Sequence, residues 1–482
     1  MSISGALSNA LSGLNVTSRR AEVVANNIAN ASTEGYSARN LDVSARSPGF
    51  AGGVRVDGIT RHVDPALQSA RRLVGASVAD AGVRDSFTGR ISDLMGLPGE
   101  PGSLGDRLAE LDAALISAAS LPDSEVRFAQ VVSRATDLVS GINSVERGIQ
   151  SLRVEADQAI NQQVGRLNTL LADVQQINAR MGSATAGENA TLADMRDGLI
   201  NEINEIVPVR VAPRDHGRIA LYTPGGAILL DGKAAEVGFA PTPTIMPHMT
   251  LDSGDLSGLS VNGVALATSP PGGALRGGSL GALFAVRDDL TVTAQAGIDG
   301  FARDLAERFQ GFGPDPTLAP TDAGLFTDLA LPVTAADEVG LAGRLRLNTA
   351  VDPASGGELW RLRDGLAATT PGPVGNNALL SALSDALNTV AAPVSGSLPT
   401  APRSLHGVMA DLQAQAGQTR HESERRLGFL TAQADVLKMQ ALENGVDTDQ
   451  EMQKLLLIEQ SYAANARVIE TVGKLLDALL RI

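Results

Sequence analysis

Residues 448–480, TDQEMQKLLLIEQSYAANARVIETVGKLLDALL, decide how one end of this chain folds. Apolar residues recur there at alternating intervals of three and four, which is the heptad spacing of a coiled-coil seam. Thr448 and Glu451 have the spacing of a capping box and so predict the start of the helix. Such a seam packs either inside a helical bundle of its own chain or against a neighbouring copy. Its positions are Leu455, Ile458, Tyr462, Asn465, Ile469, Val472, Leu476 and Leu479.

The other end of the chain, residues 1–30, also has helical periodicity. The predicted seam there comprises Leu7, Leu14, Val24 and Ile28. Three asparagines follow near the end of this helix, Asn26, Asn27 and Asn30, and Gly35 predicts the stop. Asparagine side chains bond to backbone groups and tolerate turns, so these residues serve either as a local helix stop or as contacts between subunits.

We expect both terminal helices to be poorly ordered in an isolated monomer and to fold on assembly. Ordering the backbone of a long helix costs more free energy than the burial of a single seam returns.

Between the ends, the periodicity predicts a very long helix over residues 122–181, or two nearly continuous ones. Shorter helical patterns cover residues 189–206, 280–309 and 404–442. After residue 206 the period changes to two, as Val207, Val209 and Val211 alternate with polar residues, which predicts strands.

These patterns predict an elongated multidomain α+β protein, in which long terminal and central coiled-coil-like helices enclose a β-rich middle insertion. Three parts are expected, each made of separate pieces of the chain. They are a terminal helical assembly domain (1–60 and 443–482), a long-helix bundle domain (61–206, 280–310 and 403–442) and one or more β-rich outer domains (207–279 and 311–402).

Composition argues against several classes of function. The net charge of −15 repels a phosphate backbone, so we expect no nucleic-acid partner. No apolar run is long enough for a membrane span, and the N-terminus lacks the pattern of a signal peptide. The chain has no cysteine, and its histidines are not in metal-ligand spacing: His62, His216, His248, His406 and His421. We therefore expect a protein that is not an enzyme, with no catalytic, cofactor-binding or metal-binding residues.

Both ends also resemble known signatures. Residues 26–37, NNIANASTEGYS, resemble the sequence shared by bacterial flagellar rod, hook and hook-associated proteins. Residues 444–452 and 460–469 resemble the matching signature at the other end of those proteins. Within that group, Tyr36-Ser37, the Met195-Arg196-Asp197 segment and the later Arg287-Asp288 pair resemble the family of flagellar hook-associated protein 1.

This resemblance implies a structural component of the flagellum that forms the junction between hook and filament by self-assembly of its terminal helices. The implied partners are other copies in a ring, the hook protein, a second junction protein and an export chaperone at the C-terminal region. The implied location is extracellular, after type III export without a cleaved signal peptide. The expected assembly interface consists of the two seams together with Asn26, Asn27, Asn30, Gly35 and Tyr36.

Three alternatives remain open from the sequence. A hook or distal-rod protein carries similar terminal signatures. A binding or enzymatic module in the β-rich insertion is a function of another class. The periodicity alone also fits a cytosolic coiled-coil scaffold.

Overall fold

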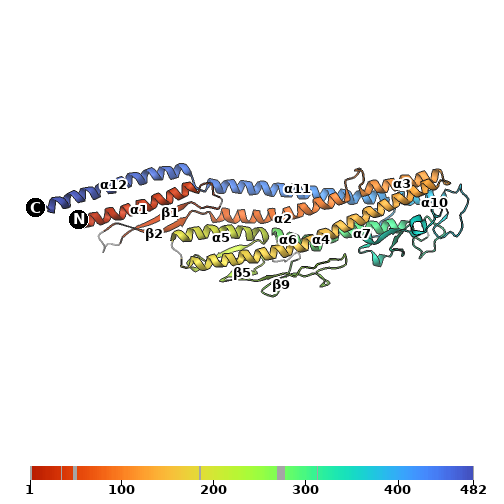
Figure 1. Ribbon diagram of the computed structural model, residues 1–482, viewed down its shortest axis with the longest axis horizontal. Helices are drawn as coiled ribbons and strands as arrows, with labels where there is room; N and C mark the ends of the chain where they lie inside the picture. Colours follow the sequence, from red (N-terminus) through yellow and green to blue (C-terminus); the bar gives the residue numbers. More distant parts are fainter. Residues whose placement is uncertain are drawn as a thin grey trace.

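A computed structural model describes residues 3–33, 35–46, 52–183, 186–268, 277–311 and 313–480. Its long helices lie side by side along one axis, and the two ends of the chain meet at one end of this rod (Figure 1). The predicted elongated α+β architecture is confirmed. The part that the sequence patterns predicted at the two ends of the chain is thus a single region in space.

The terminal region contains two helices and a hairpin. Helix α1 (Ile3–Ala29) lies beside helix α12 (Thr448–Leu480). Strands β1 (Arg39–Ala45) and β2 (Val54–Arg61) form an antiparallel hairpin in which Arg39 is paired with Arg61. The hairpin contacts α1 on one side and leads into the body of the rod on the other.

The body is a bundle of long helices. Helix α4 (Glu125–Met181) has 57 residues and therefore spans about 85 Å. Helices α2 (Pro65–Met95), α3 (Leu104–Ser120), α5 (Ala186–Ile206) and α11 (Leu405–Glu443) pack along it or along one another. Their shared core is aliphatic, with completely buried side chains that include Leu108, Leu111, Leu115, Leu138 and Ile142.

The start of α2 shows why the chain turns from the hairpin into the bundle at this point. The Asp64 carboxylate accepts hydrogen bonds from the backbone N–H groups of Ala66 and Leu67, at 2.9 and 3.1 Å. Pro65 occupies the first helical position, where its missing N–H costs nothing.

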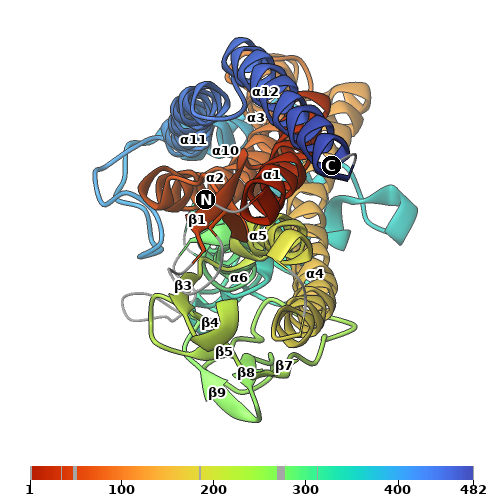
Figure 2. The ribbon, with the colours of Figure 1, turned by 90° about the vertical axis from the view of Figure 1, so that its left-hand side faces the viewer.

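The strands after α5 form two small antiparallel sheets on one side of the bundle (Figure 2). The first has the order β3 (Arg210–Pro213), β4 (Ile219–Tyr222), β5 (Ile228–Asp231) and β6 (Lys233–Ala234). The second consists of β7 (Val237–Gly238), β8 (Leu259–Val261) and β9 (Val264–Leu266). The predicted strand at 207–211 begins later, because Val207 is fully buried at the end of α5.

The prediction that residues 311–402 form a β-rich outer domain was wrong. Their described part has only two short paired strands, β10 (Phe326–Asp328) and β11 (Leu345–Leu347), and short helices that include α10 (Ala378–Asn388). Phe326, Leu380 and Leu387 are fully buried in the same core as α3 and α4. Frequent glycines and prolines divide this region into segments too short for periodicity to assign.

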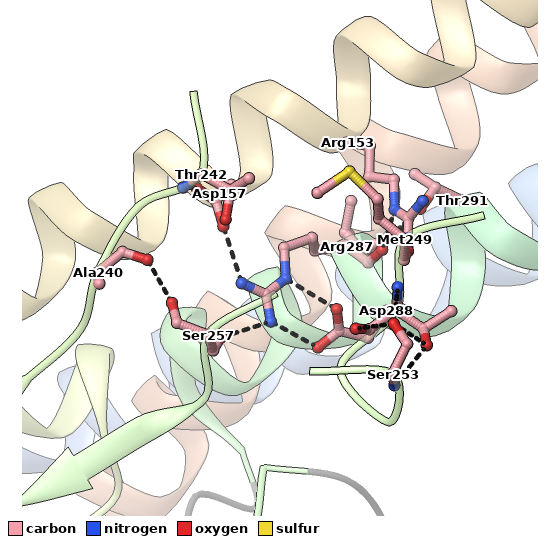
Figure 3. Close-up of polar contacts among 12 residues, drawn as sticks. Arg153, Asp157, Ala240, Thr242, Met249, Ser253, Ser257, Arg287, Asp288 and Thr291 are labelled. Atoms are coloured by element: carbon pink, nitrogen blue, oxygen red, sulfur yellow. Dashed lines mark hydrogen bonds and ion pairs between the residues drawn. The ribbon is translucent and has the colours of Figure 1, made fainter. Parts of the chain in front are cut away.

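A buried ionic cluster attaches the second sheet and its loops to the bundle (Figure 3). Helix α6 (Gly278–Ala285) continues through a π-helical turn (Val286–Leu290) into α7 (Thr291–Arg308), and the turn carries Arg287. The Arg287 guanidinium is fully buried, 2.8 Å from Asp157 of α4 and 2.8 Å from Asp288. It also donates to the backbone carbonyl of Ser257 at 3.0 Å.

The charge on Arg287 is fully compensated. Burial by itself lowers the pKa of its guanidinium, but hydrogen bonds and ion pairs with Asp288 and Asp157 outweigh that effect and raise the pKa. Arg153, one turn before Asp157, donates to the carbonyl of Arg287 at 2.9 Å and to that of Met249 at 2.6 Å. Removing one partner from such a cluster leaves a buried charge without its counter-ion, which is strongly destabilising.

Candidate assembly interface

The seam predicted for α12 faces α1 of the same chain over most of its length. Leu455, Ile458, Asn465 and Ile469 are partly buried there, and Val472 is 5% exposed. Helix α1 offers small and branched side chains in return, among them Ala10, Val16, Thr17, Val23 and Val24.

Two seam positions do not follow this pattern. Tyr462 and Leu476 are 51% and 40% exposed, so neither is covered by α1. The side chain of Leu479 lies outside the described residues. On α1, the predicted positions Leu7, Leu14 and Ile28 are partly buried.

Gly13 and Asn465 meet where the two helices come closest. A Cβ atom on Gly13 would lie 2.8 Å from Oδ1 of Asn465, so the asparagine occupies the space that glycine leaves. Its amide also donates to the carbonyl of Ser461 at 3.0 Å. This contact fits a role for Asn465 in setting the axial register of α1 and α12, as polar residues in coiled-coil seams do.

Asn27 is the centre of the terminal region. Its side chain is buried and makes four hydrogen bonds, which is its full capacity. The amide nitrogen donates to the Arg39 carbonyl at 2.9 Å and to Oε2 of Glu451 at 3.0 Å. The amide oxygen accepts from the Tyr36 hydroxyl at 2.9 Å and from the Arg39 N–H at 3.0 Å. One side chain thus joins α1, the segment before the hairpin, strand β1 and α12.

Glu451 does not form the predicted capping box. Asp447 caps α12 instead, because its carboxylate accepts from the N–H groups of Asp449 and Gln450 at 2.9 and 3.1 Å. Glu451 is 4% exposed and points toward α1, where it binds Asn27. It also pairs with Lys454 of its own helix at 2.6 Å. The sequence spacing was read as a helix start, whereas this carboxylate links the two ends of the chain.

Ion pairs continue from this centre into the body of the rod. Arg39 and Arg61, which are paired across the hairpin, both bind Asp194 of α5, at 3.0 and 2.8 Å. Asp197, one turn later, binds Arg61 at 2.6 Å and Arg72 of α2 at 3.1 Å. We call Asn27, Glu451 and these five charged residues the terminal hub.

The positive charges of the hub favour the ionised form of Asp197. Burial raises the pKa of Asp197, but the hydrogen bond and charge of Arg61 and the charge of Arg72 outweigh it, so the pKa is lowered overall. Burial also raises the pKa of the Tyr36 hydroxyl, an effect that the nearby Arg39 charge reduces and that Asp194 and Glu451 reinforce. The Arg39 guanidinium also lies 4.8 Å from the centre of the Tyr36 ring.

The three predicted asparagines therefore have different roles. Asn27 belongs to the hub, whereas the Asn30 side chain donates to the Asn26 carbonyl at 2.9 Å, as in a local helix stop. The Asn26 side chain and Gly35 are exposed, and Gly35 has a φ of 82°. The ion-pairing residues of the hub were not predicted, although Asp197 lies in a segment that carried the family resemblance.

An open groove of about 390 Å³ lies beside the hub, between α1, β1 and α12. Its walls combine apolar and basic side chains, including Val23, Leu457, Arg20, Arg39 and Lys454.

Among the described residues, no group of His, Cys, Asp and Glu is arranged to hold a metal ion. None of the described helices is both long and apolar enough to span a bilayer.

The first prediction concerns Asn27. Asn27→Ala removes four hydrogen bonds and leaves Glu451 buried without its amide donor, which costs about 1–3 kcal/mol. Local opening of α12 becomes about 5- to 150-fold more frequent, and limited proteolysis within α12 accelerates accordingly. Asn26→Ala is the matched control, since the neighbouring side chain is exposed, and its cleavage rate stays near that of the parent protein. Equal rates in the two variants would contradict the role of the hub.

The second prediction concerns pH. Because the folded-state pKa of Asp197 is lowered, its ion pairs contribute stability above the pKa of about 3.9 that it has when unfolded. This contribution is lost as the pH falls through the lower folded-state value. Thermal unfolding measured between pH 7 and pH 2 is expected to show this loss, and Asp197→Asn, already weakened at pH 7, shows a smaller one. An identical pH profile for the variant would count against the assignment.

Three parts of the chain match known protein families. Residues 88–312 match the helical domain of the flagellar hook-associated protein FlgK. Residues 7–36 match the flagella basal body rod protein family. Residues 442–482 match the C-terminal family of the flagellar basal body rod FlgEFG proteins. The two shorter matches cover α1 and α12, which the hub joins.

Individual relatives agree with these matches. Flagellar hook-associated protein 1 of Escherichia coli (strain K12) is 23% identical over 563 residues, with 100% of both chains covered. The protein of the same name from Salmonella typhimurium is 26% identical over 288 residues, which are 53% of this chain and 51% of that one. A solved structure, of the flagellar hook junction protein FlgK from Burkholderia pseudomallei, has a TM-score of 0.44 and 17% identity, over 55% of this chain and 46% of that chain.

The resemblance predicted from the two ends of the sequence is thus confirmed: the chain is similar over its whole length to flagellar hook-associated protein 1, and its domain matches are to structural components of the bacterial flagellum.

Proposed function

We propose that this protein forms the junction between the flagellar hook and filament by self-assembly of its terminal helices. The observation that carries the proposal is that α1 and α12 pair at one end of the rod and still leave apolar surface uncovered. Exposed side chains on α12 include Met452, Leu456, Leu457, Tyr462, Val468 and Leu475. Isolated exposed apolar residues are common, but a helix that carries this many has the surface of an interface.

The small buried area of α12 supports assembly as the source of its stability. Among its described side chains, only Glu451 and Val472 are buried. Copies packed side by side cover the remaining apolar face, which is the reason for expecting the terminal helices to order on assembly. The contacts between copies are head-to-tail, as a ring or tube requires.

The same proposal includes the partners and location implied by the family. The ring lies outside the cell, with the hook protein on one side and a second junction protein on the other. Its copies arrive through the type III export channel without cleavage of a signal peptide, escorted by a chaperone that binds the C-terminal region. The role is mechanical and involves no catalysis. The relatives that match are named as flagellar hook-associated proteins, which favours this role over an enzymatic module.

Deletion of residues 450–482 tests the proposal in motile cells. Loss of α12 exposes the face of α1 that it covers and removes the exposed apolar side chains of α12. We expect intact hooks, filament protein shed into the medium and loss of swimming, with swimming restored by the full-length protein. Loss of the hooks themselves would favour the alternative, a hook or distal-rod protein. Unchanged swimming and filament attachment would contradict the proposal.

A further inference from the structure

The second half of α11 carries an apolar stripe that none of the described residues covers. One side of this half packs on α2 through partly buried residues such as Leu430 and Leu437. The other side exposes Phe429, Val436 and Met439 by 70%, 66% and 60%. Together with the exposed Ala432, these residues recur at intervals of three and four, so they lie on one face of the helix. We call Phe429, Ala432, Val436 and Met439 the α11 stripe.

Two basic side chains flank the stripe. Arg425 and Arg426 lie about one turn before Phe429 and are exposed. Neither forms an ion pair with another residue in the part of the chain that the structure describes. Arg420, by contrast, pairs with Asp93 and Glu424. The stripe therefore combines an apolar surface with two positive charges that have no counter-ion among the described residues.

A groove of about 860 Å³ lies between α2, α4, α5 and α6. We call it the α2–α4 groove. Small residues such as Gly82 and Ala159 leave it open. Apolar side chains line its floor, among them Val83, Phe87, Leu152 and Leu283.

The carboxylates at the mouth of the groove outnumber its guanidiniums. Glu155 and Glu202 are paired with Arg90 and Arg166. Glu205 is exposed and has no ion pair with any described residue. Burial and the nearby Glu202 raise the pKa of the Glu205 carboxyl by more than the Arg166 charge lowers it.

The stripe and the groove have the same length and lie at a similar position along the rod axis. Arg425 to Met439 and Leu152 to Arg166 each cover about 21 Å of helix at 1.5 Å per residue. Helix α11 runs antiparallel to α2, with Gln413 bonded to the Met95 carbonyl at 3.1 Å. Phe429 therefore lies at about the same position along the rod axis as the middle of α2, where Gly82 lines the groove. Helix α2 packs against both α11 and α4, and Figure 1 shows it between them, so the stripe and the groove belong to separate parts of the rod.

We propose that the α11 stripe of one copy packs into the α2–α4 groove of a second copy, with Arg425 and Arg426 near Glu205 of that copy. The stripe and the groove have opposite charges, the same length and a similar position along the rod axis. This match favours a second copy of this chain as the occupant. A contact between two different surfaces of the same chain is head-to-tail, and such a contact repeats around a ring. This inference rests on the proposed junction function, since it names the contact between neighbouring body regions.

Disulfide cross-linking tests the contact, because the natural chain has no cysteine. Ala432→Cys and Ala159→Cys are combined in the full-length protein, and isolated flagella are oxidised. We expect a disulfide-linked dimer that requires both cysteines. The control combines Ala432→Cys with Asn161→Cys, since Asn161 is exposed on α4 but does not line the groove. At least tenfold more dimer with the Ala159 pair than with the control pair supports the inference, and equal yields overturn it.

Charge reversal provides the second measurement. Arg425→Glu with Arg426→Glu places like charges beside Glu205, so we expect filaments to be shed while the monomer keeps its helical circular dichroism. Adding Glu205→Arg restores the attraction and is expected to recover filament attachment. Failure of this rescue in a folded triple variant overturns the inference.

The two proposals can fail separately. Filaments that stay attached in cells without this chain contradict the junction function. Filaments that require the chain, with no excess cross-link at Ala159, contradict only the contact between the stripe and the groove.

Discussion

The four hydrogen bonds of Asn27 are the constraint on which the terminal region depends. A buried amide is stable only when its donors and acceptors are all satisfied. Here the partners come from the segment before the hairpin, β1 and α12, so they can be satisfied only when both ends of the chain are in place. The bond to Glu451 spans 424 positions of sequence, and the ion pairs beyond it connect the ends to α5 and α2. The terminal helices are thereby aligned with the rod.

The hub holds only the first turn of α12. Beyond Glu451 the helix rests on α1 along one seam, and its opposite face is exposed and apolar. The ionic cluster around Arg287 is different, because the Arg287 and Asp157 side chains are fully buried and the cluster fixes the loops beside the outer strands to α4 and the π-helical turn. The molecule thus combines a rigid body with an end that is anchored at one point, an arrangement suited to a subunit that completes its packing against neighbouring copies.

Long-range periodicity predicted α1, α4, α5, α11 and α12, whereas α2 and α3 were missed. A continuous heptad pattern is informative over the length of α4, and the signatures at both ends identified the family. Polar partners were harder to predict, because spacing alone cannot distinguish a carboxylate that caps its own helix from one that binds a distant helix. Glu451 was therefore assigned to the wrong partner, and Arg39, Arg61 and Asp194 were missed. Residues 311–402 were misassigned because their buried leucines lie in short segments, whose place in the core depends on distant helices.

Hydrogen exchange across residues 455–480 is the most direct test of the central claim that α12 is completed by its neighbours. It compares isolated full-length monomer with assembled flagella, and the amides of α4 provide an internal reference in both samples. The account predicts that these residues exchange far faster than the α4 core in the monomer and become strongly protected after assembly. Protection in the monomer equal to that of α4 would contradict it, because α12 would then owe its order to its own chain alone.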